Sequence, residues 1–198
     1  MKRFISLFAL ALAMFASPAA FADTLYYRAT MSGPAEADPN ASPGYGVAFF
    51  IVDDVALTMN MNVPFFDLLG PTTAAHIHCC TADPLVGAAG VATTTPTFPD
   101  FPGGVTTGLY QRTFSLADAA FYNPAYITAN GGTVDSARTA FLSGLASNEG
   151  YFNIHTSQYP GGEIRGFLVA APIPEPSSWG MLALGIGALG LWGRRRRS

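Results

Sequence analysis

The sequence predicts an all-β domain, an antiparallel β-sandwich or flattened barrel with one short helix. Apolar and polar residues alternate strictly from Val55 to Val63, a period of two that places one strand face on a core and the other in water. Further stretches are rich in β-branched and aromatic residues and are separated by turn-forming residues. Charged residues make up only 12% of the 198 residues, which argues against an intrinsically disordered protein.

The expected strands follow one another with recognisable turns between them. Asp53 and Asp54 indicate a hairpin turn, and the Pro-Gly-Gly sequence at 160–162 indicates the turn that joins the last two strands. The expected strands cover residues 24–31, 46–52, 55–63, 74–80, 108–115, 150–156 and 163–169.

Two segments lack the strand pattern. Residues 82–104 are rich in Gly, Pro, Thr and Ala, which predicts a long loop. Residues 134–146 carry apolar side chains at helical spacing, which predicts one short helix. Asp135 favours a helix start at this point, because acidic and capping side chains are enriched there.

The N-terminus predicts a secretory signal peptide over residues 1–22. A positively charged start is followed by an apolar run over residues 4–15 and by a small-x-small cleavage site that ends at Ala22. A transmembrane anchor is the alternative, but the apolar run is too short to span a bilayer. We therefore expect residues 23–173 to form the exported domain.

Residues 174–198 predict a second targeting segment. Pro174, Glu175 and Pro176 come first, an apolar stretch over residues 179–193 follows, and four consecutive arginines stand almost at the end of the chain. With the preceding serines and with snorkelling arginines, the stretch predicts a membrane-spanning helix whose arginines lie in the cytoplasm. The alternative is a buried core helix, and four terminal arginines argue against it.

This segment resembles the PEP-CTERM sorting signal of Gram-negative bacteria. The resemblance implies recognition by exosortase-type machinery, export through the inner membrane, and a precursor that the C-terminal helix anchors in the membrane. The mature protein is then expected at the cell surface or in the extracellular matrix, with exopolysaccharide or other surface proteins as its partners.

Charge distinguishes the ends of the chain from the domain between them. The whole chain has a formal net charge of −3, but residues 23–173 contain four arginines, no lysine and twelve acidic residues, a charge of −8. Because the interior has no basic patch, we expect no binding to nucleic acid. The acidic domain instead favours solubility and the attraction of cations.

The chain has three histidines, His76, His78 and His155. A period of two places the side chains of His76 and His78 on one face of their strand, about 6–7 Å apart. If the strand that contains His155 lies beside it, three imidazoles converge as a ligand set for zinc or copper with an open fourth position. The alternative is that each histidine is structural and only bridges backbone groups.

Cys79 and Cys80 are the only cysteines, and export places them in an oxidising compartment. A disulfide between these neighbours is the first expectation. The second is a metal-ligating thiolate at Cys80, on the strand face of His76 and His78, which would favour copper or zinc. Two free thiols or an intermolecular bridge are further alternatives.

Glu163 and Arg165 share a face of the last expected strand. The pattern favours a structural ion pair between them near the hairpin. The alternative is that Glu163 accepts the proton of a ligand imidazole and so supports a metal site from outside.

Four short sequences, taken together and in this order, resemble the CHRD domain, which is named for repeats in chordin. They are Ala-Thr-Met-Ser-Gly at 29–33, Ala-His-Ile-His at 75–78, Tyr-Phe-Asn-Ile-His-Thr at 151–156 and Pro-Gly-Gly-Glu-Ile-Arg-Gly at 160–166. The resemblance covers residues 24–169 and implies a mostly extracellular, β-sandwich-like domain without an established catalytic activity. The histidines that the family shares correspond to the three of this chain, whereas Cys79 and Cys80 stand where Gly-Pro is usual.

These observations predict an exported, non-enzymatic surface or matrix protein with a CHRD-type binding domain, in which the three histidines are a candidate metal site. One alternative is a copper- or zinc-binding protein for storage or delivery. Another is a metal-dependent oxidoreductase, which rests on analogy of fold alone. The sequence contains neither the Gly-x-Ser-x-Gly nor the His-Glu-x-x-His motif of two hydrolase classes.

Overall fold

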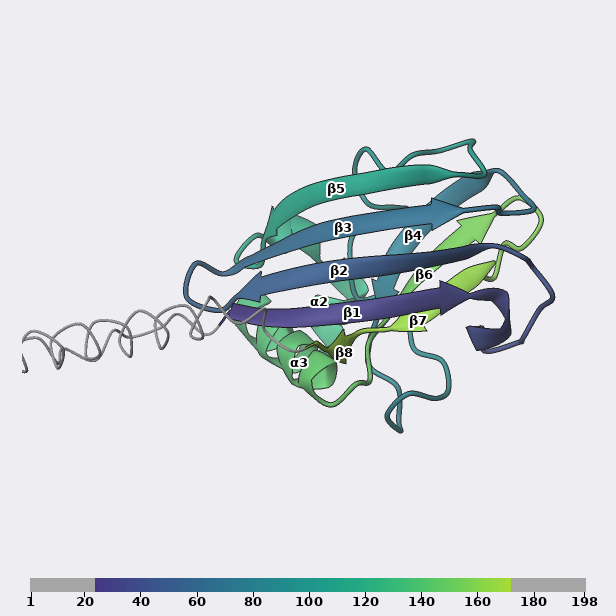
Figure 1. The fold of residues 1–198 in the computed structure, drawn as a ribbon. Helices are drawn as coiled ribbons and strands as arrows, with labels where there is room; N and C mark the ends of the chain where they lie inside the picture. The colour runs from purple at the N-terminus through teal and green to yellow at the C-terminus, as the bar shows by residue number, and fades with distance from the viewer. Residues whose placement is uncertain (1–23, 172–198) are drawn as a thin grey trace, which may run out of the picture.

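Strands dominate the structure, a computed structural model that describes residues 24–171 (Figure 1). The strands are β1 (Thr24–Ser32), β2 (Tyr45–Asp53), β3 (Thr58–Phe66), β4 (Thr72–His78), β5 (Gly108–Ser115), β6 (Tyr151–Thr156), β7 (Ile164–Phe167) and β8 (Val169–Ala170). The helices are α2 (Pro124–Ala129) and α3 (Val134–Ala146), with short 3-10 turns η1 (Gly33–Ala35) and η2 (Ala119–Phe121). The predicted all-β class with one main helix is confirmed.

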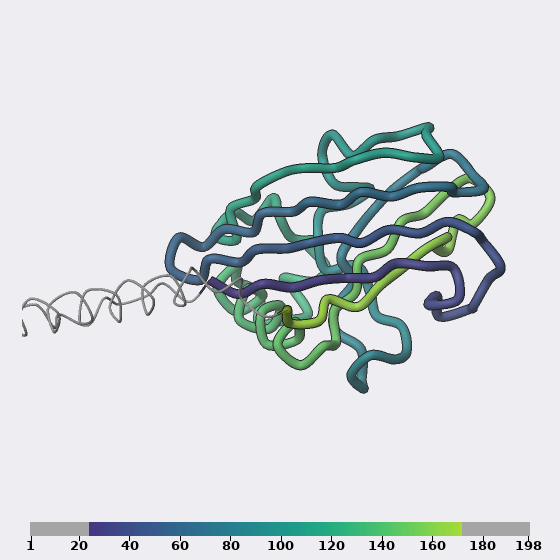
Figure 2. Tube along the Cα trace, viewed as in Figure 1, coloured from purple at the N-terminus to yellow at the C-terminus, as the bar shows by residue number. Residues whose placement is uncertain are grey.

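The strands form one antiparallel sheet in the order β4-β6-β7-β1-β2-β3-β5, and β8 also pairs with β1. The sheet curls into a half-barrel, as Figures 1 and 2 show. A flattened barrel therefore describes the fold better than two facing sheets. The order places β4 beside β6, although β5 and both helices lie between them in the sequence.

The long loop between β4 and β5 contacts both edge strands of the sheet. The Phe98 N–H donates to the Ala75 carbonyl of β4, and the Tyr110 hydroxyl of β5 donates to the Pro99 carbonyl. The Phe98 ring is fully buried and lies parallel to that of Phe152, with centroids 6.0 Å apart. The loop thus joins both edges of the half-barrel and supplies part of its core.

The core lies on the side of the sheet that faces α3 and this loop. Side chains that are fully buried there include Phe50, Phe65, Phe121, Phe141, Phe152, Met31, Met59, Met61, Ile77 and Leu116. The bounds of α3 coincide with the predicted helix. Its N-cap is Thr133, which forms a capping box with Ser136, while Asp135 lies in the first turn.

Three local predictions differ from the structure. The alternation begins later than expected, because Val55 and Leu57 lie in the β2–β3 turn, where the Asp53 carboxylate accepts the Val55 N–H. The strand β4 ends at His78 rather than at Cys80. The short helix α2 was not predicted, because six residues are too few to give a periodic pattern.

The two predicted targeting segments, the signal peptide over residues 1–22 and the sorting segment over residues 174–198, lie outside the described residues. Pro174, Glu175 and Pro176 belong to the second of them. Among residues 24–171, no helix has the length and hydropathy needed to cross a membrane.

Candidate metal centre

The three histidines come together on the sheet face opposite the core. His76 and His78 lie on β4, and His155 lies on the neighbouring strand β6, where it pairs with Ala74. The ring centroids are 5.2 Å apart for His76 and His155, and 5.9 Å apart for each of the other two pairs. The pairing of β4 with β6 therefore gathers the imidazoles that the sequence singled out.

Each imidazole is oriented by one hydrogen bond to a backbone carbonyl. The pairs are His76 Nε2 with Pro96 O at 2.6 Å, His78 Nδ1 with Ala89 O at 2.9 Å and His155 Nδ1 with Pro160 O at 2.9 Å. A carbonyl only accepts, so the bonded ring nitrogen carries the proton and donates. The other nitrogen of each neutral ring then has a free lone pair.

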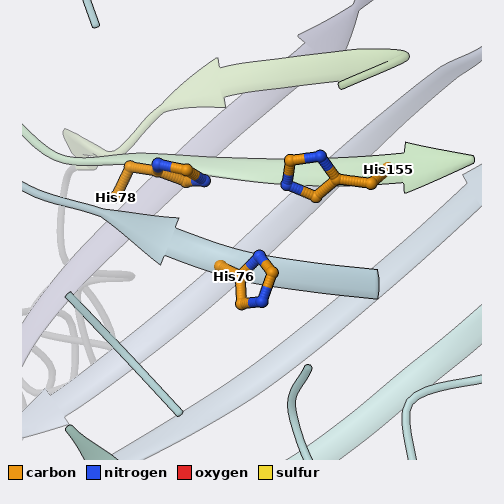
Figure 3. Close-up of side chains that lie close together, drawn as sticks. All are labelled: His76, His78 and His155. Atoms are coloured by element: carbon orange, nitrogen blue, oxygen red, sulfur yellow. The ribbon is translucent and has the colours of Figure 1, made fainter. Parts of the chain in front are cut away.

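These remaining nitrogens are buried and have no hydrogen-bond partner: they are Nδ1 of His76 and Nε2 of both His78 and His155. Figure 3 shows a nitrogen of each ring turned toward the other two rings. One potential ligand atom from each histidine lies within 4.8 Å of the others. Three unpaired lone pairs this close together can bind a cation.

The electrostatics keep the imidazoles neutral. Burial lowers the pKa of all three histidines, and that of His78 falls to about 4. The hydrogen bond from His78 to Ala89 acts in the opposite direction, and the nearby histidines and Arg165 lower the pKa of His78 further. At neutral pH the free nitrogens are therefore available as ligands without the loss of a proton.

Glu163 does not belong to this site. Its buried carboxylate accepts hydrogen bonds from the Ser42 and Thr156 hydroxyls and from the Leu69 and Gly70 N–H groups. Burial raises the pKa of Glu163, but these bonds outweigh burial and the net shift is downward. The interpretation of Glu163 as the proton acceptor of a ligand imidazole is therefore wrong.

Arg165 does not pair with Glu163 either. Its Nε lies 3.9 Å from Glu36 Oε2 and donates to the Ala35 carbonyl, while Nη1 donates to the Gly87 carbonyl. The predicted ion pair is wrong because β7 begins at Ile164, so Glu163 lies outside the strand and its carboxylate turns toward the donors named above. Burial raises the pKa of the Glu36 carboxyl to about 7, against the opposing influence of Arg165 and Asn153.

Cys79 and Cys80 form a disulfide in the structure. The pair faces the helices: Cys80 Sγ lies 3.9 Å from the Tyr126 hydroxyl, and a Cβ at Gly144 of α3 would overlap both sulfurs. Glycine costs about 1 kcal/mol inside a helix, and here it makes room for the disulfide. With both sulfurs bonded, the thiolate ligand considered for Cys80 is not present in this structure.

Sequence reasoning missed Tyr151, whose ring lies parallel to that of His78 with centroids 4.8 Å apart. The signal was available, because Tyr151, Asn153 and His155 alternate along β6 and therefore share one face. Asn153 also has a buried amide oxygen without a partner, while its amide nitrogen donates to Glu36.

Comparison with known families gives two matches. The model of the CHRD domain matches residues 27–168, and that of the PEP-CTERM protein-sorting motif matches residues 172–197. No curated protein and no solved structure matches the chain. The two matches indicate an exported surface protein that exosortase machinery of a Gram-negative bacterium sorts from a membrane-anchored precursor.

Proposed function

The chain belongs to the CHRD domain family, and from this premise we propose that its exported domain is a non-enzymatic binding module that holds one zinc or copper ion. His76, His78 and His155 are the ligands. One observation carries the proposal: each of the three rings has a buried nitrogen without a partner, and the rings present potential ligand atoms within 4.8 Å of one another.

Purely structural histidines would leave a different pattern. A buried polar atom without a partner costs about 1–3 kcal/mol, so folded proteins rarely keep several of them together. Here each ring meets one carbonyl and leaves the opposite nitrogen unpaired. A bound ion would remove this cost at all three positions at once.

The chemistry of the three rings favours zinc or copper. Neutral imidazole nitrogens suit these ions, whereas magnesium and calcium prefer oxygen ligands. The carbonyls of Pro96, Ala89 and Pro160 take the role that backbone acceptors have at known histidine sites, where they fix the tautomer and the ring plane. When bound, the ion supplies a cross-link between β4 and β6.

The burial of the free nitrogens supports the binding of an ion, because water does not compete for them. Three histidines leave the fourth position of a tetrahedral ion open, so the proposal of a non-enzymatic module rests on the family resemblance and not on the ligand count. The three free nitrogens are all shielded from solvent. Storage or delivery of the metal and a metal-dependent oxidoreductase remain the alternatives.

Metal analysis tests this proposal on the full chain, purified in detergent without chelator. We expect about one equivalent of zinc or copper per chain, as for a single three-histidine site. The copper-loaded protein should give an electron paramagnetic resonance spectrum with nitrogen couplings, and His76→Ala should lose both the metal and the spectrum. Less than about a tenth of an equivalent after loading would contradict the proposal. Turnover of superoxide by the loaded protein would instead favour the oxidoreductase.

The partners of the domain are a separate part of the proposal. We infer exopolysaccharide or other surface proteins from the sorting motif, which directs such proteins to the cell surface. Capture on the polysaccharide of the producing cell tests this inference. Indifference to both polysaccharide and surface proteins would contradict it.

A further inference from the structure

We propose that Tyr151 and Arg165 are positioning residues for the metal centre, which fix the ring of His78 so that its Nε2 faces the other two imidazoles. The inference rests on the proposed metal site and adds residues that do not themselves bind the ion. Three independent sets of contacts support it.

The first contact fixes the plane of the His78 ring. Tyr151 lies opposite His78 in the β4–β6 register, and the two rings are stacked 4.8 Å apart with an interplanar angle of 6°. The other two imidazoles are tilted by 84° and 40° relative to His78. Among the described aromatic neighbours of His78, Tyr151 alone lies parallel to it, and rotation of the His78 ring would break this stack.

The second contact fixes the proton on the His78 ring. The Ala89 carbonyl accepts from His78 Nδ1 at 2.9 Å and from the Tyr151 hydroxyl at 3.3 Å, while the Ala89 N–H donates to the Tyr151 hydroxyl oxygen at 3.2 Å. The phenol therefore holds both polar groups of Ala89. Because Ala89 O selects the Nδ1–H tautomer, Tyr151 indirectly keeps Nε2 free as a ligand.

The third contact supports Tyr151 from its other side. Strand β6 lies between β4 and β7, so His78 and Arg165 approach Tyr151 from opposite flanks. The Arg165 guanidinium lies 4.6 Å from the centroid of the Tyr151 ring. Its Nη1 also donates to the Gly87 carbonyl at 2.8 Å, two residues before Ala89.

These contacts also fix the position of an exposed loop segment, residues 82–88. Residues 82–88 are exposed, so polar contacts rather than buried side chains hold this part of the loop near the site. Arg165 donates to the carbonyl of Gly87 within this segment, and His78 and Tyr151 donate to the carbonyl of Ala89, which follows it directly. Loss of the phenol would leave Ala89 bonded to His78 alone, and His78 could then rotate and exchange between its two tautomers.

The experiment compares Tyr151→Phe and Tyr151→Leu with the wild-type full chain in detergent. Tyr151→Phe keeps the stack and loses the hydroxyl, whereas Tyr151→Leu loses both. Tyr45→Leu is the matched control, because Tyr45 is half exposed and stacks on Phe66 rather than on a histidine. We expect Tyr151→Leu to weaken zinc affinity by about 10- to 100-fold, Tyr151→Phe to weaken it less, and Tyr45→Leu to leave it unchanged.

A second readout uses the metal-free protein. Imidazole 15N shifts should report a single Nδ1–H tautomer for His78 in the wild type and a mixture in Tyr151→Leu. A wild type that binds no zinc would defeat the proposed function, while the tautomers would still decide the role of Tyr151. Unchanged affinity together with a single tautomer in both variants would overturn the inference. If Tyr151→Leu does not fold, Tyr151→Phe decides by the same two readouts.

Discussion

Two buried polar clusters on this sheet differ in whether their hydrogen-bonding capacity is met. The Glu163 carboxylate accepts four hydrogen bonds, two on each oxygen, from side chains and backbone of three different segments. Each imidazole of the histidine cluster uses one nitrogen and leaves the other without a partner. Buried polar atoms are common to both clusters, so unmet capacity, rather than burial, distinguishes the proposed metal site from the structural network around Glu163.

The two clusters should therefore affect the free energy of unfolding in opposite directions. A fully paired buried carboxylate stabilises the fold, and removal of its acceptors leaves several donors unpaired. Unpaired imidazole nitrogens lower the free energy of unfolding of the metal-free protein, and an ion that binds them would raise it again. Perturbing each cluster in turn tests this contrast.

The largest effect is expected at the satisfied cluster. Glu163→Gln replaces one acceptor oxygen by an NH₂ group, so hydrogen bonds from Gly70 and Thr156, or from Ser42 and Leu69, are lost. We expect a loss of about 3 kcal/mol in the free energy of unfolding, measured by urea denaturation. The same loss should appear with and without zinc, because Glu163 does not contact the histidines.

The matched control is Glu149→Gln, the same substitution at a half-buried position of the loop before β6. It should change the free energy of unfolding by less than about 0.5 kcal/mol. If Glu163→Gln were as mild as this control, the contrast between the two clusters would fail.

The next effect is expected from pH at the histidine cluster. Burial places the pKa of the folded His78 at about 4, below the ordinary value of 6.5. The neutral ring is favoured in the folded state, so its contribution to stability is present above pH 6.5 and is lost as the pH falls toward 4. As the pH falls over this range, the free energy of unfolding in urea should thus decrease more steeply for the metal-free wild type than for His78→Gln.

The contribution of Glu36 to stability changes with pH in the opposite direction, so it has to be subtracted. Its folded-state pKa is raised to about 7, so its contribution to stability is present at low pH and is lost as the pH rises through 7. Because wild type and His78→Gln both retain Glu36, the difference between their curves isolates His78. Parallel curves from pH 7 to 4 would contradict the assigned burial.

Local pattern was enough to predict one part of the histidine site but not the whole of it. The His-x-His spacing placed His76 and His78 on one face because side chains alternate along any strand. The position of His155 beside them depends on the pairing of β4 with β6. These strands are separated by more than 70 residues, and no local pattern specifies that they pair. The sequence therefore predicted the convergence of the three imidazoles on one condition, the pairing of their strands, and the topology meets that condition.

The predicted partners of Glu163 and Cys80 failed for a related reason. Both predictions extended a strand by one or two residues, and period two then assigned Cys80 to the face of His76 and His78, and Glu163 to the face of Arg165. The strands β7 and β4 stop short of them, so Glu163 meets donors from two loops and from Thr156 at the end of β6, and the Cys80 sulfur meets α3. Strand ends are set by the contacts of neighbouring loops, which the alternation does not contain.

The central claim is that three unpaired imidazole nitrogens form a metal site, and the most direct test is the free energy of unfolding as a function of zinc concentration. At a zinc concentration about 100 times the dissociation constant, the wild type should gain about 2.7 kcal/mol. His155→Ala should gain nothing at the same concentration, because one of the three ligands is gone. No gain in the wild type, or an equal gain in His155→Ala, would contradict the claim.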